Sequence, residues 1–133
     1  MSAITVYENE QVTVWYHPDQ KIIHHQMHQY THGQAFRDAL LAGLEAMKKY
    51  QADKWLSDDR LNIVLNPEDQ QWSEGVWRPL AIAAGWKYWA IVQPEHLFAK
   101  LRMEKLAEVN SQLGVTVQFF SDPEEAMKWL ESR

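Results

Sequence analysis

The segment from Trp86 to Gln93 constrains the fold of this chain more than any other part of its sequence. It reads WKYWAIVQ and is nearly continuous in apolar and aromatic residues. A strand with one face in water alternates apolar and polar residues, whereas a strand covered on both faces carries an unbroken apolar run. The segment therefore predicts the central strand of a sheet with helices on both faces, which is an α/β fold.

The rest of the 133-residue chain contains the strands and helices that such a sheet requires. Two β-branched and aromatic runs predict an N-terminal hairpin, a third strand follows a proline-containing turn, and helical apolar spacing then alternates with further strands. The predicted strands are Ile4–Glu8, Val12–Tyr16, Lys21 to about Tyr30, Lys54–Asp58, Trp86–Gln93 and Val115–Phe120. The predicted helices are 31–50, Asn66 to about Ala84, Pro94–Leu113 and a last one capped by Asp122.

Local signals mark where these helices begin or bend. The T-x-x-Q pattern of residues 31–34 predicts a capping box at the start of the first helix. Asn66 and Asp122, each followed by a proline, are predicted N-caps. Pro79 lies inside the second helix and lacks the N–H that would bond the Gly75 carbonyl, so a bend is expected there. Within the third helix, residues 101–103 are the expected place of a break.

The element order is β-β-β-α-β-α-β-α-β-α in a single domain of residues 1–133. Antiparallel N-terminal strands, followed by strands that alternate with helices, predict a mixed sheet with parallel crossovers. The loops that leave the strands at Asp58, Gln93 and Phe120 should then meet at one end of the sheet. Open α/β sheets bind their ligands at that end.

Composition excludes several classes of function. The chain has no cysteine, which removes disulfides, thiolate metal sites and cysteine nucleophiles. A net charge of -5 argues against nucleic-acid binding, because neutralising phosphates requires concentrated Lys and Arg. The sequence shows neither a secretory signal pattern nor an apolar run approaching the roughly 20 residues of a membrane-spanning helix. A cytoplasmic location and no cofactor are expected.

Four histidines, at positions 24, 25, 28 and 32, raise the question of a metal site. On a strand His24 and His28 share a face but stand about 13 Å apart at roughly 3.3 Å per residue, too far for one ion. His25 points to the opposite face. An exposed or pH-responsive strand is therefore favoured, and no metal site is predicted.

Four segments resemble the STAS superfamily, and most closely its bacterial SpoIIAA-like single-domain members. They are 54–60 (KWLSDDR), 66–72 (NPEDQQW), 85–92 (GWKYWAIV) and 122–126 (DPEEA). The resemblance covers essentially the whole chain and implies a mostly parallel sheet with four helices, used as an interaction or small-ligand switch. In the regulatory branch, a partner kinase phosphorylates a serine at the start of the second helix. That start carries no hydroxyl before Ser73 here, so no phosphorylation site is predicted.

Polar residues at the expected ligand-binding end are the candidate site. Asp58 and Asp59 end a strand on opposite faces, so one is expected to pair with Arg60 and the other to bond a neighbouring loop. Asp58 is the best candidate for a functional carboxylate. His96, with Glu95 or Asp58, has the residue types of a general base and its orienting group, although a surface role is favoured. The candidate binding residues are Asp58, Asp59, Arg60, Asn66, Glu68, Asp69, Gln93 and His96.

Glu68 and Asp69 permit two interpretations. They could act as a permanent negative charge in place of a phosphate. The favoured interpretation is that they are first-turn acids that oppose the helix dipole.

The sequence predicts a non-enzymatic STAS-like regulatory or binding module whose partner is a protein or a small molecule. Two alternatives remain open: a carrier of an apolar or lipid molecule, as the lipid-binding branch of the family suggests, and a small hydrolase or lyase that uses Asp58 and His96. Seven tryptophans cannot all be buried cheaply, because each buried indole N–H needs a partner. Trp15 and Trp77 are the predicted interaction surface for a partner protein or a second copy in a homodimer.

Overall fold

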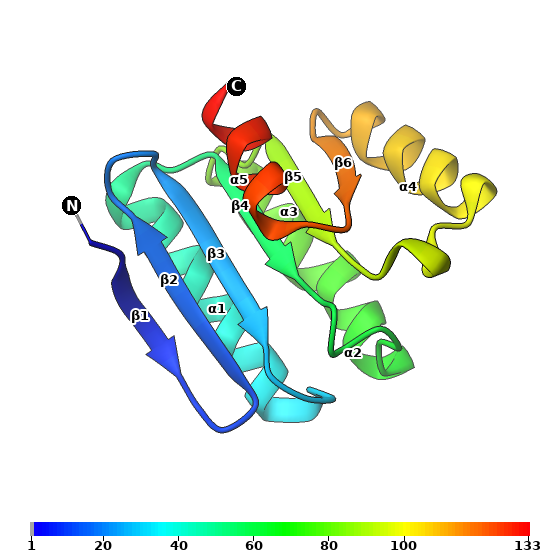
Figure 1. Cartoon of the computed structure of the whole chain (residues 1–133). Coiled ribbons are helices and arrows are strands. Elements are labelled where there is room, and N and C mark those ends of the chain that lie inside the picture. The colour runs from blue at the N-terminus through cyan, green and yellow to red at the C-terminus, as the bar shows by residue number, and fades with distance from the viewer. Residues whose placement is uncertain (1) are drawn as a thin grey trace.

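A computed structural model describes residues 2–133, with Lys100 described by its backbone alone. Six strands form one mixed sheet in the order β1-β2-β3-β4-β5-β6, with the first three antiparallel and β3 to β6 parallel (Figure 1). The predicted α/β class and the change from antiparallel to parallel pairing are confirmed. The strands are β1 (Ile4–Glu8), β2 (Val12–His17), β3 (Ile22–Met27), β4 (Lys54–Asp58), β5 (Tyr88–Val92) and β6 (Thr116–Phe120).

The helices alternate with the parallel strands in the predicted order. They are α1 (Gly33–Tyr50), α2 (Pro67–Trp72), a π-helical turn η1 (Ser73–Trp77), α3 (Arg78–Ala83), a 3-10 turn η2 (Glu95–Leu97), α4 (Lys100–Gln112) and α5 (Pro123–Glu131). No helix in the described part of the chain is both long and apolar enough to cross a membrane.

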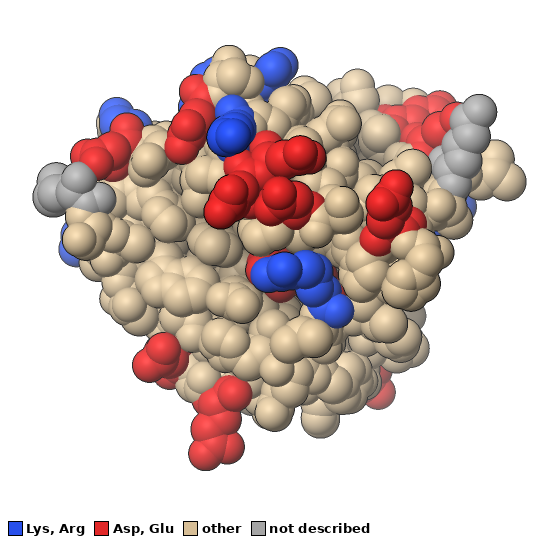
Figure 2. Space-filling model, in the orientation of Figure 1, with Lys and Arg blue, Asp and Glu red and all other residues tan. Residues whose placement is uncertain are grey.

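The two faces of the sheet are covered unequally. Helix α1 and the segment α2-η1-α3 lie behind the sheet in Figure 1 and enclose the larger core, which includes Val14, Ile23 and Trp55. Helix α5 lies in front and packs on β4, β5 and β6 through Ala126 and Leu130. The front of β1 to β3 carries no helix, and its surface is largely uncharged (Figure 2).

Two details of the predicted elements are wrong. Strand β5 is covered on both faces, as expected, but it is the second strand from the edge, and β3 and β4 occupy the centre. This is because three strands lie on one side of β4 and only two on the other. The third helix begins at Lys100, after an extended Phe98 whose ring packs against Phe119 at 5.9 Å. The break therefore precedes residues 101–103.

Helix α1 is not started by the predicted capping box. The Thr31 hydroxyl donates to the carbonyls of Gln29 (2.9 Å) and Gln11 (3.3 Å), away from the helix. The N–H of Gly33 instead donates to Oδ2 of Asp69 at 2.8 Å, and Arg37 Nε donates to the other oxygen at 3.1 Å. A buried carboxylate from α2 thus caps α1, a contact between residues 36 positions apart.

The bend expected at Pro79 takes the form of the π-helical turn η1. The N–H of Arg78 bonds the Ser73 carbonyl, five residues back, so the turn contains one extra residue. Residues five apart lie one turn apart in this arrangement, which places Trp72 and Trp77 on the same side of the segment. Trp77 is buried and packs in the core. The prediction of Trp77 as an outer interaction surface is wrong for this reason.

Candidate functional site

A cavity of about 360 Å³ opens at the carboxyl end of the parallel strands, on the face covered by α1 and α3. Strands β3, β4 and β5 form its floor, and α1, η1 and α4 form its walls. This is the end of the sheet where the sequence predicts a ligand. The lining residues that determine its chemistry are His25, Trp55, Ser57, Asp59, Trp77, Arg78, Trp86, Trp89, Gln93, Arg102 and Leu106.

Four tryptophans supply most of the flat apolar lining. The rings of Trp55, Trp77, Trp86 and Trp89 contact one another in a chain, with successive centroids 5.1, 5.1 and 5.3 Å apart. Two of these contacts are edge-to-face and the third, between Trp86 and Trp89, is tilted, and such contacts hold the rings in fixed orientations. The cavity is therefore lined by ring surfaces suited to a planar or compact apolar group.

The indole N–H groups of this cluster are mostly used inside the protein. Trp77 donates to the Leu40 carbonyl at 2.8 Å, Trp89 to Ser57 Oγ at 2.8 Å, and Trp55 to His25 Nδ1 at 3.0 Å. The Trp86 N–H is buried and has no partner among the described residues. A buried donor without a partner costs free energy, so this part of the lining is not fully satisfied by the protein's own groups.

His25 and Asp59 form the polar centre of the cavity. His25 Nε2 lies 2.7 Å from Asp59 Oδ1, and its Nδ1 accepts the Trp55 N–H. Because an indole nitrogen is only a donor, Nδ1 carries no proton, and Nε2–H donates to Asp59. His25 is therefore neutral in this arrangement and orients a carboxylate whose side chain is 21% exposed.

Ser57, His25 and Asp59 lie together but do not form a hydrolytic triad. In such a triad the histidine bonds the serine with one ring nitrogen and the carboxylate with the other. Both nitrogens of His25 are occupied by Trp55 and Asp59. Ser57 Oγ accepts the Trp89 N–H instead, so no base is positioned to take its proton.

The remaining charged side chains lie nearer the rim. Arg102 on α4 is exposed and donates to Gln93 Oε1 at 3.2 Å. Glu74 is exposed and accepts from Gln70 at 3.2 Å. Arg78 is half-buried, and its guanidinium makes no hydrogen bond or ion pair with the described residues. Two cationic and one anionic side chain thus border the mouth, while Asp59 lies beside the buried His25.

Asp58 and Arg60 belong to the opposite face of the sheet. Asp58 is buried and accepts two bonds from the Arg60 guanidinium, at 2.9 Å from Nε and 2.7 Å from Nη2. This pairing raises the pKa of the Arg60 guanidinium. The expectation that one of the two aspartates pairs with Arg60 is confirmed. The other bonds His25, and not a loop backbone as expected, because Asp59 points into the core face.

His24 lies on the same face as Asp58. Its Nδ1 is 3.1 Å from His17 Nε2, its ring packs at 4.9 Å from Trp15, and its Nε2 is buried without a partner. Burial, reinforced by the neighbouring His17, lowers the His24 pKa to about 3. The pKa of His17 is also lowered by burial. Both imidazoles are thus neutral near pH 7.

The structure brings three of the residues predicted from the sequence to the cavity and leaves the others elsewhere. Asp59, Gln93 and Trp77 line it. Asn66 is the predicted N-cap and accepts the N–H groups of Glu68 at 3.0 Å and Asp69 at 3.3 Å. Glu68 is exposed in the first turn of α2. Residues that do not line the cavity are Asp58, Arg60, Asn66, Glu68, Asp69, His96 and Trp15.

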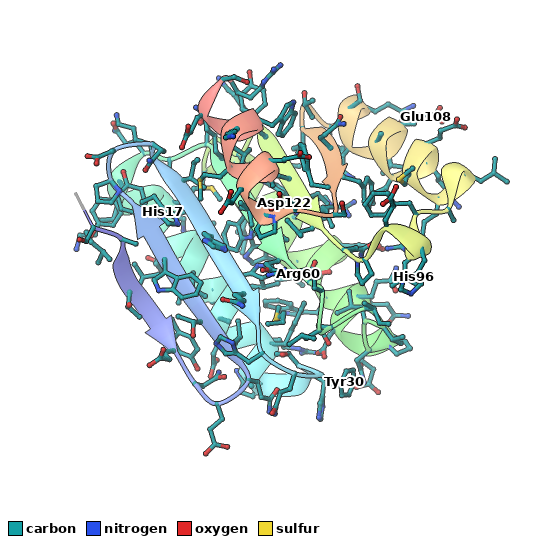
Figure 3. The ribbon with its side chains drawn as sticks, in the orientation of Figure 1. His17, Tyr30, Arg60, His96, Glu108 and Asp122 are labelled. Atoms are coloured by element: carbon teal, nitrogen blue, oxygen red, sulfur yellow. The ribbon has the colours of Figure 1, made fainter. Side chains whose placement is uncertain are left out.

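His96 lies apart from the two aspartates. It is exposed on η2, and Figure 3 places it at the outer side of the molecule, away from Arg60. His96 does not line the cavity, and it takes no part in the pair between Asp58 and Arg60. The arrangement therefore does not assemble Asp58 and His96 into an acid–base pair.

Sequence reasoning missed His25 as a site residue. The alternation of side chains along the strand placed His25 on the face opposite His24. Its hydrogen-bond partners, Trp55 and Asp59, lie 30 and 34 positions away in the sequence. Only the parallel register, which sets His25 beside Ser57, creates the cluster. Within residues 2–133 no group of three or more His, Asp or Glu side chains is arranged to hold a metal ion.

Neither protein-family models, nor curated proteins, nor solved structures give a match to this chain. The likeness to STAS domains thus stays a prediction from the sequence pattern.

Proposed function

We propose that this chain is a small-molecule-binding module whose ligand occupies the tryptophan-lined cavity at the carboxyl end of the sheet. One observation carries the proposal: a concave site of about 360 Å³ combines four indole rings with a few convergent polar groups. Ligand sites in proteins have this composition and this size. The position also matches the end of an open α/β sheet where ligands bind.

We propose a non-enzymatic role, as the sequence predicts. Ser57 has no base, and His25 has no free nitrogen. Asp58 is buried in its pair with Arg60, whereas His96 is exposed on η2. A hydrolase or lyase that relies on Asp58 and His96 is therefore disfavoured. The STAS-like pattern supports a regulatory use of the bound ligand, and the apolar lining equally supports carriage of an apolar molecule.

Native mass spectrometry of the freshly purified protein tests the proposal. We expect a population whose mass exceeds that of the chain and which loses the excess on unfolding. Leu106→Phe should reduce that population, because Leu106 lines the cavity from α4. Leu113→Phe, at the exposed end of the same helix, is the matched control and should retain it. Retention that is identical in both variants would refute the cavity as the binding site.

A protein partner is the second candidate, favoured by the open face of β1 to β3. Trp15 is half-buried there against His24, within a largely uncharged surface (Figure 2). A homodimer through this face predicts a doubled mass in size-exclusion chromatography with light scattering. Trp15→Lys should convert such a dimer to a monomer, whereas a monomeric wild-type chain would exclude it.

A further inference from the structure

The carboxylate that lines the cavity beside His25 has no cationic partner among the described residues. Asp59 Oδ1 accepts the Nε2–H of His25 at 2.7 Å, and His25 is neutral because its Nδ1 is occupied by the Trp55 N–H. Among the described residues Asp59 Oδ2 has no hydrogen-bond partner. Arg60, the nearest basic residue in the sequence, is engaged with Asp58 on the other face.

The aromatic walls favour the same kind of ligand. A cation placed over the face of an indole is attracted by its quadrupole, and clusters of aromatic rings recognise ammonium groups in this way. Trp89 bonds Ser57 on β4, two residues before Asp59, which directly follows the strand, and Trp55 bonds the histidine that orients Asp59. Trp55, Trp89 and the carboxylate therefore lie together along the floor of the cavity.

From this arrangement we infer that the cavity binds an organic ammonium ion, with its charge at Asp59 and its apolar part against the indole rings. The inference rests on the proposed function and specifies the ligand class. The ammonium N–H groups donate to the unoccupied Oδ2, and the apolar body fills the space bounded by Trp77, Trp86 and Leu106.

The arginines do not reverse this preference. Arg102 is exposed and already bonds Gln93. Arg78 is half-buried, and the exposed Glu74 carries the opposite charge at the same mouth. Water screens exposed charges more strongly than buried ones. The Asp59 side chain is 21% exposed and bonds a buried histidine, so water screens its charge less than that of the exposed Arg102.

Three probes of similar shape test the charge preference: 2-phenylethylammonium, 2-phenylethanol and phenylacetate. Calorimetric titration of the wild-type chain should give affinities in the order cation, alcohol, anion, with the cation at least tenfold tighter than the alcohol. Asp59→Asn keeps an amide oxygen for His25, so the fold is maintained. The variant should bind the cation about tenfold more weakly and the alcohol unchanged.

Glu108→Gln changes the net charge equally, lies on the outer part of α4 and should leave all three affinities unchanged (Figure 3). If the alcohol or the anion binds as tightly as the cation, or if Asp59→Asn leaves cation binding intact, the inference is overturned while the binding site stands. If none of the probes binds and the purified chain retains no molecule, the proposed function fails as well.

Discussion

Replacing Gly43 by alanine tests the packing that fixes the cavity wall. Gly43 is buried in the middle of α1, and a Cβ there would overlap Cη2 of Trp55 and lie 2.7 Å from its Cζ3. Trp55 cannot retreat without cost, because its N–H bonds His25 and its ring packs at 5.1 Å against Trp77. The glycine is thus required by a close approach between helix and strand.

The expected magnitude follows from two opposing effects. Alanine in a helix interior gains about 0.5–1 kcal/mol over glycine. Overpacking a filled core costs about 1–3 kcal/mol, and the severe overlap with a fixed ring places this case at the upper end. The net loss in the free energy of unfolding should be about 2 kcal/mol, or a shift of about 1 M in the urea midpoint at an unchanged m-value of about 2 kcal/mol/M.

Urea unfolding followed by far-ultraviolet circular dichroism measures this loss. Gly75→Ala is the matched control, because a Cβ at Gly75 meets no atom within 4 Å. It should leave stability unchanged or raise it by about 0.5 kcal/mol. If Gly43→Ala is as stable as the wild-type chain, the contact between α1 and Trp55 is not as described.

Three further predictions concern stability and site assignment. The His24 pKa of about 3 lies below its unfolded value near 6.5, so its contribution to the free energy of unfolding is complete above pH 6.5 and is lost as the pH drops toward 3. At pH 5 the free energy of unfolding should be lower by about 2 kcal/mol. His24→Leu should reduce the slope of the free energy of urea unfolding against pH between pH 7 and 5. Asp69→Ala removes the cap of Gly33 and the partner of Arg37 and should lower the thermal unfolding free energy by about 2 kcal/mol, whereas Glu68→Ala beside it should change it by less than about 0.5 kcal/mol. Asp58→Asn breaks the pair with Arg60 and should destabilise the chain in the same assay, yet ligand retention in native mass spectrometry should persist, because Asp58 lies on the other face; loss of the ligand from a folded Asp58→Asn protein would contradict the site assignment.

Local sequence signals predicted the elements because their causes are local. The apolar run of residues 86–93 places β5 between covered faces, and the Asn66 and Asp122 caps form as their side-chain chemistry requires. The β-β-β start and the alternation that follows determine which strand ends meet. The end of the sheet that holds the cavity could therefore be predicted without coordinates.

The composition of the cavity could not be predicted, because it depends on contacts between distant segments. The pairing of His25 with Asp59 requires the register of β3 on β4. The burial of Trp77 requires the extra residue of the π-helical turn, which a period of 3.6 residues does not anticipate. Thr31 and Asp69 show the same limit, because a distant carboxylate replaced the local cap.

The indole N–H signals in a two-dimensional nitrogen–proton NMR spectrum test the central claim most directly. Single Trp→Phe variants assign the seven signals, and the three probes of different charge are then added in turn. A ligand in the cavity should shift the signals of Trp86 and Trp89, which line it, and leave those of Trp15 and Trp129, which do not. Probes that bind and shift Trp15 while the cavity tryptophans stay unchanged would contradict the account.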